Sequence, residues 1–404
     1  MAAKRIGASA KARLRTTRPR SQSASEKIVV GVLSAGAPHS PLMAGALYAI
    51  HEKKLTFNLI LTSGAGAIMG LLFMGPKGKS PQAGLRDVVE IGVSDPIYRF
   101  FPLGYKTFFK ASPFTKLFAD LANRFKVPVS PREIGKELSE SQRRKRLYND
   151  SIDFWFSALT PTSLTLLSKG LCAPPPFLDD LIDFHKVNHR SPRDPLKGLV
   201  VNAYNIDKKR MDWFSTPNLN AAHLRAAFAF PFIYPPADLG SHPYYEGATY
   251  DPLDTHVPYH MAPGDHGPVT LPGVPDLEKI LQSFFDGKTF SIEHYEFVVI
   301  DILGSLATHL VRTPRDLWDA YGLSIMVPIV ALAKKADDAM GEHPNIHRIT
   351  FHIPEDRRAD LLEWNYSNLA AMFDIGYAAG LKWIHDNPRV LPQQQPGPAP
   401  EPET

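Results

Sequence analysis

The sequence contains one cysteine, Cys172, and no long apolar run. A single cysteine excludes a disulfide framework and fits a reducing compartment. The longest apolar runs, such as residues 324–333, are far shorter than the ~20 residues that span a bilayer. We therefore expect no integral membrane segment. No internal repeat is evident either. Because no histidine motif accompanies Cys172, we interpret it as a small buried apolar residue and not as a nucleophile.

The chain also lacks a basic binding face, although its formal net charge is +4. Residues 1–26 carry seven Lys and Arg against one Glu, a balance of +6, which leaves about −2 for the rest of the 404 residues. We therefore expect no nucleic-acid recognition by the folded part. The basic tail has no apolar core of a secretory signal. It is interpreted as a disordered tail in contact with anionic lipid, with a mitochondrial-type presequence as the alternative. The expected location is cytoplasmic, with peripheral membrane contact as an option.

What the sequence does contain is an alternation of apolar strands and helices. Residues 28–33 and 58–61 are short apolar runs typical of buried strands. Residues 42–51 and 65–73 have helical character. Strand, helix, strand and helix within about 45 residues predict parallel strands joined by right-handed crossovers.

The rest of the chain divides into an insertion and a return to the sheet. Residues 84–190 show no clear strand and many aromatic side chains, which predicts a helical insertion over the sheet. Further strands are expected at 198–204, 295–302 and 348–352, followed by a long helix at 358–385. The folded domain is expected over residues 27–388, with a disordered Pro/Gln-rich end at 389–404.

Position 64 holds a glycine where its surroundings favour a serine nucleophile. Residues 57–70 read as a buried strand, a tight turn and a helix, which is the architecture of a nucleophile elbow with the pattern G-x-S-x-G. Here the five residues are Thr62-Ser63-Gly64-Ala65-Gly66. The pattern of the turn is retained, whereas the reactive hydroxyl is missing.

Three separated segments, in this order, carry a resemblance to a known family. Residues 33–47 resemble the glycine-rich opening L-S-G-G-G-A-R-G and the G-V-L that follows it. Residues 62–67 resemble G-T-S-A-G-A. Residues 224–236 and 243–248 resemble R-A-S-x-A-x-P-x-x-F-P-P and the later Y-x-D-G-G. Over about residues 28–255 the chain thus resembles the patatin-like phospholipases, or acyl hydrolases. This resemblance implies an α/β fold, a three-layer α/β/α sandwich with a mostly parallel central sheet.

The resemblance implies a serine–aspartate dyad and no cofactor or metal. The carboxylate takes the serine proton as the hydroxyl attacks an ester, and backbone N–H groups of the glycine-rich loop hold the oxyanion. In this sequence the nucleophile position is Gly64. The base position is Glu246, one methylene longer than aspartate.

The oxyanion loop also departs from the pattern. Ala35 and Ala37 replace glycines on either side of Gly36, and alanine resists the positive φ that such loops often require. Pro38 follows directly and removes a backbone donor.

Three functions stay open at this point. The favoured one is a pseudoenzyme that binds a lipid acyl chain, or a partner, without hydrolysis. The second is an active lipid acyl hydrolase with a displaced nucleophile, such as Ser63, or a water activated by Glu246. The third is a structural or membrane-associated protein without a ligand.

Other polar segments are weighed as binding sites. Residues 105–125 interleave Lys and Arg with Phe, a pattern typical of a helix on a lipid interface. The alternative is a helix packed on the sheet with its lysines in solvent. Residues 143–146 are interpreted as a solvated helix face. The His/Asp cluster at 251–266 is interpreted as a polar surface loop and not as a metal site, because prolines interrupt it.

Overall fold

The part of the chain that the computed structural model describes comprises residues 27–37, 39–250, 284, 295–303, 317–340, 342–354 and 363–394. The predicted tails at 1–26 and 395–404, Pro38 and the polar cluster at 251–266 lie outside these residues. Residues 389–394, predicted to be disordered, are held instead by backbone hydrogen bonds. The N–H of Thr56 donates to the carbonyl of Pro392 at 3.0 Å, and that of Gln394 to Lys54 at 2.7 Å.

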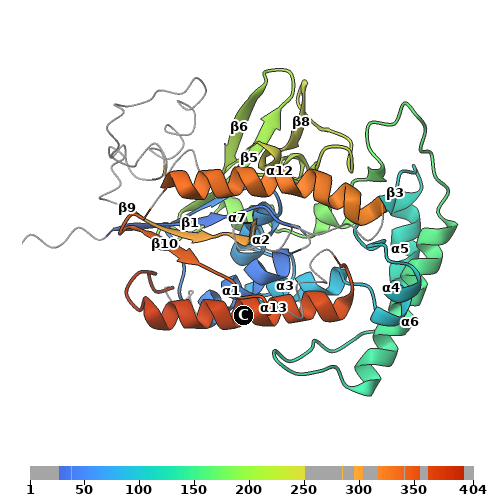
Figure 1. Cartoon of the computed structure of the whole chain (residues 1–404), viewed down its shortest axis with the longest axis horizontal. Coiled ribbons are helices and arrows are strands. Elements are labelled where there is room, and N and C mark those ends of the chain that lie inside the picture. Colours follow the sequence, from blue (N-terminus) through green and yellow to red (C-terminus); the bar gives the residue numbers. More distant parts are fainter. Residues whose placement is uncertain are drawn as a thin grey trace, which may run out of the picture.

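A central sheet of eight strands organises the fold (Figure 1). Its order is β10-β9-β1-β2-β5-β8-β7, and β6 pairs with β5. The parallel strands are β1 (Ile28–Leu33), β2 (Leu59–Thr62), β5 (Gly198–Asn205), β9 (Tyr295–Ile300) and β10 (Ile346–Ile349). The antiparallel strands are β6 (Arg210–Ser215), β7 (Ala237–Leu239) and β8 (His242–Glu246). The predicted mostly parallel sheet is confirmed, and the three antiparallel strands were not predicted.

Helices cover both faces of this sheet. Figure 1 shows α12 (Leu317–Met340) on one side and α13 (Tyr366–Asp386) on the other. α1 (Ser40–Glu52) lies against α13, and α2 (Ala65–Met74) packs beside α1. The α1–α13 contact depends on glycine, because a β-carbon on Gly376 would overlap the carbonyl oxygen of Leu42. This arrangement is the expected α/β/α sandwich.

The core lies between the parallel strands and these helices. Val32, Leu33, Ile60 and Leu61 have no exposed surface. Buried parallel strands read as continuous apolar runs because both of their faces are covered, which is why these strands were predictable. In the described part of the chain, no helix has the length and apolarity needed to cross a membrane.

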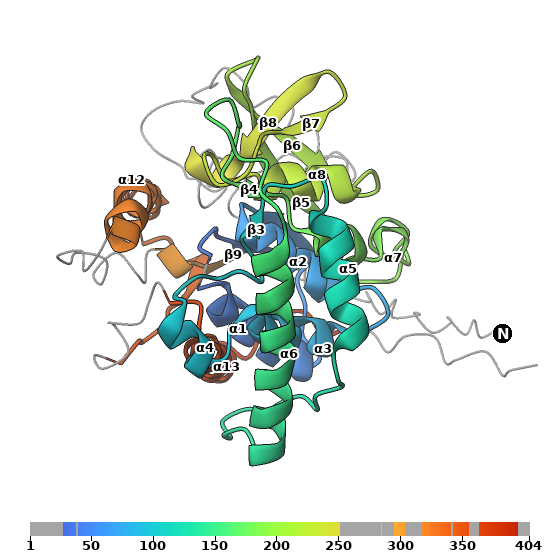
Figure 2. The same cartoon turned by 90° about the vertical axis from the view of Figure 1, so that its right-hand side faces the viewer.

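The insertion is largely helical and stands at one end of the sheet, where Figure 2 shows α5 and α6 side by side. Its elements are α3 (Pro81–Arg86), η1 (Asp87–Ile91), α4 (Asp95–Phe100), α5 (Thr115–Phe125), α6 (Glu140–Leu159), η2 (Pro176–Asp180) and α7 (Phe184–Asn188). It also holds a two-stranded pair of β3 (Phe109–Lys110) and β4 (Cys172–Ala173), so the expectation of no strand was wrong here. The remaining helices are α8 (Ala221–Phe228) and η3 (Gly247–Thr249).

Candidate functional site

The strand-to-helix turn predicted at residues 62–66 is present. β2 ends at Thr62, α2 begins at Ala65, and Gly64 between them has φ 52° and ψ −125°. L-amino acids other than glycine rarely adopt this conformation, which is stored strain where it does occur. Gly66 is needed for a second reason, since a β-carbon there would overlap the carbonyl oxygen of Leu33 at the end of β1. Residue 64 therefore occupies the apex of a sharp strand-to-helix turn, which is the geometry expected of a nucleophile elbow.

The sheet topology brings Glu246 to this apex. β5 pairs with β2 over Gly198–Val201 and with β8 over Ala203–Asn205, while β6 takes its other edge. β2 and β8 therefore share one edge of β5 and meet end to end. β8 finishes at Glu246, whose backbone N–H donates to the carbonyl of Ala229 at 3.0 Å. The two positions inferred from separate motifs, 64 and 246, lie together.

The Glu246 side chain fills the space that a serine side chain at residue 64 would need. A β-carbon built on Gly64 would overlap Oε1 of Glu246 and would lie 3.0 Å from Cδ of the same residue. It would also lie 3.0 Å from Cβ of Ala35. The longer acid and the missing side chain are thus sterically complementary.

Burial changes the chemistry of this carboxyl. Glu246 is 8% exposed, and burial raises its pKa to about 8. A buried carboxyl favours its neutral form because the ionised form loses its hydration. In the described part of the chain no cation offsets this effect. At neutral pH the group is mostly protonated, and a protonated carboxyl cannot accept a proton from a nucleophile.

The loop after β1 lies beside the apex. Ser34 Oγ donates to the carbonyl of Ala35 at 3.0 Å and accepts from the N–H of Ile302 at 3.0 Å. Gly36 has φ 139°, whereas neither Ala35 nor Ala37 adopts a positive φ. The alanines are therefore not strained, because the one position that requires glycine has kept it.

The alternative nucleophile is enclosed. The Ser63 side chain has no exposed surface, and its backbone carbonyl accepts from Gly66 within the turn at 2.9 Å. Ser40 is the first residue of α1 and is 5% exposed. Cys172, the one cysteine, is half-buried, and burial raises its pKa to about 11, which disfavours the thiolate. In the described residues no group of three or more His, Cys, Asp or Glu could hold a metal ion.

A cavity of about 460 Å³ opens beside the turn, between the core and the insertion. Ala37, Ser40 and Ala65 form its end near the elbow. Gly64 and Glu246 are set back from its described lining. Most of its accessible surface is apolar and comes from α2, α5, α6 and neighbouring segments, including Ile68, Met69, Leu72, Val88, Ile91, Phe109, Phe118, Ala122, Phe156, Phe177 and Phe228. Charged side chains, among them Asp87, Lys106, Lys110 and Asp153, also line it. These wall residues were not predicted from the sequence, although the aromatic content of the insertion was a visible signal.

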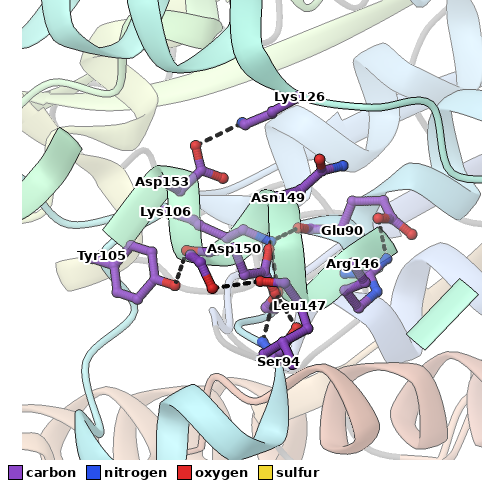
Figure 3. A network of polar contacts seen from close by, with 12 residues as sticks. Glu90, Ser94, Tyr105, Lys106, Lys126, Arg146, Leu147, Asn149, Asp150 and Asp153 are labelled. Carbon is purple, nitrogen blue, oxygen red and sulfur yellow. Dashed lines mark hydrogen bonds and ion pairs between the residues drawn. The ribbon is translucent and has the colours of Figure 1, made fainter. Parts of the chain in front are cut away.

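A polar network joins α6 to neighbouring segments of the insertion (Figure 3). Asp150 on α6 forms an ion pair with Lys106 at 2.6 Å and accepts from the N–H of Ser94 at 2.7 Å. Tyr105 donates to the carbonyl of Asp150 at 2.9 Å. Asp153, one turn further along α6, pairs with Lys126 at 2.7 Å, and its pKa is raised, mainly by burial.

These contacts correct two expectations. Lys106 is not in solvent, and Lys110 donates to the carbonyls of Ala158 and Thr160 at 2.9 and 3.2 Å. Only part of the 105–125 segment, α5, is helical. Arg146 was expected on a solvated face but is 5% exposed, with its guanidinium carbon 3.5 Å from the ring centre of Tyr366 and an ion pair to Glu90. Contacts with α6 account for the two lysines. Packing against Tyr366, the first residue of α13, accounts for Arg146.

Comparison with known protein families agrees with this geometry. The family model described as patatin-like phospholipase matches residues 31–259, which are 229 of the 404 residues. No curated protein matches the chain. Among solved structures, VipD from Legionella pneumophila is similar at 15% identity and a TM-score of 0.31, covering 86% of this chain and 67% of VipD. The family match includes the end of β1, the strand-to-helix turn, β5 and β8, and extends over more than half of the sequence. The chain therefore belongs to the patatin-like phospholipase family.

Proposed function

We propose that this chain is a patatin-like pseudoenzyme, which binds a lipid acyl chain and does not hydrolyse esters through a serine–aspartate dyad. The observation that carries the proposal is the pairing of Gly64 with Glu246. The apex residue has no hydroxyl, so no acyl-enzyme can form there. The Glu246 carboxyl takes up the space of the β-carbon that would carry this hydroxyl.

Burial argues against the two hydrolytic alternatives. Ser63 has no exposed surface and is not accessible to a substrate carbonyl. Glu246 is a poor general base at neutral pH, since burial raises its pKa to about 8. A water activated by Glu246 would therefore become effective only in alkaline solution. Ester hydrolysis by such a water should therefore be sought in alkaline solution.

The cavity supports a ligand-binding role over a purely structural one. Its volume of about 460 Å³ falls within the ~300–1,000 Å³ of ordinary ligand sites. Most of its accessible surface is apolar, which suits a hydrocarbon chain, and lysines such as Lys106 and Lys110 suit an acidic headgroup. Members of a phospholipase family act on lipids, so an acyl chain is the ligand class that fits both the family and the wall.

The test combines a serine-directed fluorophosphonate probe, a chromogenic acyl ester and lipid extraction. We expect no labelling at any pH and no ester turnover above background at pH 7. Turnover at pH 9 that Glu246→Gln abolishes would instead establish the water-activating alternative. Mass spectrometry of an organic extract of the purified protein should find a stoichiometric lipid. Lack of any bound lipid, together with no uptake of a fluorescent fatty acid, would favour a structural role and contradict the binding proposal.

A further inference from the structure

Charged side chains line part of the cavity, and one of them has no partner of opposite charge. The five lining acids each form an ion pair with a lysine or arginine; they are Asp87, Glu90, Asp120, Asp153 and Asp180. Three of the four lining lysines, Lys106, Lys116 and Lys126, each pair with an aspartate. The fourth, Lys110, pairs with no carboxylate in the part of the chain that the structure describes. Among these residues, Lys110 therefore gives the lining one uncompensated positive charge.

The ammonium group of Lys110 is held at the C-terminal end of α6. Its Nζ donates to the carbonyls of Ala158 and Thr160 at 2.9 and 3.2 Å. The last carbonyls of a helix carry partial negative charge, which favours a cation there. A lysine has three N–H donors, so Lys110 keeps one for a ligand. Lys106 keeps none, because it pairs with Asp150 and also donates to two backbone carbonyls.

This charge lies in the insertion, where the cavity meets solvent. Lys110 is exposed, and its backbone is fixed by Thr115, whose buried hydroxyl donates to the Lys110 carbonyl at 2.6 Å. Figure 1 shows β3, the strand that carries Lys110, apart from α2, which follows the elbow. The elbow end of the lining is formed by the uncharged Ala37, Ser40 and Ala65. The cavity is therefore polarised, with its free cation at the solvent side and an uncharged inner end.

We propose that the cavity binds an anionic single-chain lipid, with its headgroup on Lys110 and its hydrocarbon end toward the elbow. The inference rests on the proposed acyl-binding function and adds the class and the direction of the ligand. A carboxylate or a phosphate monoester can accept the remaining N–H, and hydrogen bonds between charged partners are the strong ones. An ester substrate must bring its carbonyl to the nucleophile at the elbow. A ligand that is bound and not cleaved can lie in the opposite direction.

Calorimetric titration of the full chain with matched lipids tests the headgroup. Oleate should bind about tenfold more tightly than oleyl alcohol, which has the same chain and no charge. Lys110→Gln keeps a donor but removes the charge, so it should weaken oleate binding by about tenfold and leave oleyl alcohol binding unchanged. Lys110→Arg keeps the charge and should retain most of the oleate affinity. The matched control is Lys145→Gln, which removes an exposed lysine from α6 outside the described lining and should bind both lipids as wild type does.

The outcomes separate this inference from the proposed function. Equal affinity for oleate and oleyl alcohol, or an equal loss of both in Lys110→Gln, would refute the headgroup assignment and leave acyl-chain binding intact. Failure of both lipids to bind would refute both proposals. A parallel titration with oleoyl lysophosphatidate identifies the headgroup. Tighter binding than oleate, lost in Lys110→Gln, would assign a phosphate, and the reverse order would assign a carboxylate.

A photoreactive fatty acid tests the direction of the chain. With a diazirine on its terminal carbon, the bound lipid should label peptides that contain Ser40 or Ala65, and an excess of oleate should prevent this labelling. Labelling at residues 109–116 or 157–160 instead would place the hydrocarbon end beside Lys110. That result would overturn the proposed direction.

Discussion

The carboxyl group of Glu246 occupies the space that a side chain at Gly64 would fill, at the apex of the strand-to-helix turn. The pair differs from a serine–aspartate pair by the loss of a hydroxymethyl group on one side and the gain of a methylene on the other. The two changes depend on each other. A serine at 64 would meet the Glu246 carboxyl, and an aspartate at 246 would leave an unfilled gap beside Gly64. This mutual dependence determines what substitutions at the site will do.

Restoring the serine alone should harm the protein. Gly64→Ser introduces a β-carbon at φ 52° that overlaps Glu246, so we expect a loss of about 1–3 kcal/mol in the free energy of unfolding and no ester hydrolysis. Urea denaturation measures the loss. Gly78→Ser is the matched control, because Gly78 has φ 67° with nothing near its β-carbon position and reports backbone strain alone. A Gly64→Ser variant no less stable than Gly78→Ser would show that the overlap is relieved without cost.

Shortening the acid should rescue that loss. In a double-mutant cycle, Glu246→Asp should be less destabilising, or even stabilising, when residue 64 is serine, with a coupling of about 0.5–3 kcal/mol. Adding Ala35→Gly removes the other close contact, which is 3.0 Å from the built β-carbon. The triple variant is the one expected to regain some esterase activity. Vigorous hydrolysis by Gly64→Ser alone would contradict the steric argument.

The buried carboxyl should make stability depend on pH. The pKa of Glu246 is raised from 4.5 to about 8 in the folded state, so the folded protein holds a proton that the unfolded chain releases. Below pH 4.5 the Glu246 carboxyl is neutral in both the folded and the unfolded state, so it costs no stability. Between pH 4.5 and pH 8 the free energy of unfolding falls by up to about 1.4 kcal/mol per pH unit as the pH rises. Glu246→Gln stays neutral and removes this contribution. Denaturation at pH 5 and pH 9 should therefore show wild type losing stability relative to Glu246→Gln, and parallel pH profiles would refute it.

The network in Figure 3 should contribute strongly to stability. Asp150→Ala leaves Lys106, whose side chain is only 13% exposed, without its carboxylate, and should cost about 3 kcal/mol. The control is Asp120→Ala on α5, where both partners of the Lys116–Asp120 pair are more than half exposed and the cost should stay within about 0.5 kcal/mol. Thermal unfolding compares the two. Similar costs would mean that the segments of the insertion are held together by their apolar contacts and not by this network.

The strands that are completely buried could be predicted from the sequence. β1 at Ile28–Leu33 is an uninterrupted apolar run and was predicted to the residue. β8, with the sequence His-Pro-Tyr-Tyr-Glu, is half polar and has a proline, so nothing local marked it as a strand. It exists because β5 offers a free edge beyond the end of β2, a relationship between distant segments.

In the candidate site, too, single residues could be predicted from local sequence, but their contacts with distant residues could not. Gly64 and Glu246 were each identified from a short motif, but the fit between them needed the end-to-end meeting of β2 and β8. Arg146 was misread because its neighbours in the sequence are charged and solvent-facing, while its partner Tyr366 lies 220 residues away. Local patterns report burial and turns well. They do not report which distant side chain fills a given space.

Filling the cavity should separate lipid binding from folding. Ala119 lies on α5 and lines the cavity, so Ala119→Trp places an indole where the acyl chain would lie. Uptake of a fluorescent fatty acid should fall by about tenfold or more, because a bound chain would lose most of its buried surface. The unfolding midpoint should change little, since the indole enters space that is already present. Ala378→Trp, on the exposed face of α13, is the matched control and should bind as wild type does. If both variants bind the fatty acid equally well, the ligand does not lie between α5 and the core.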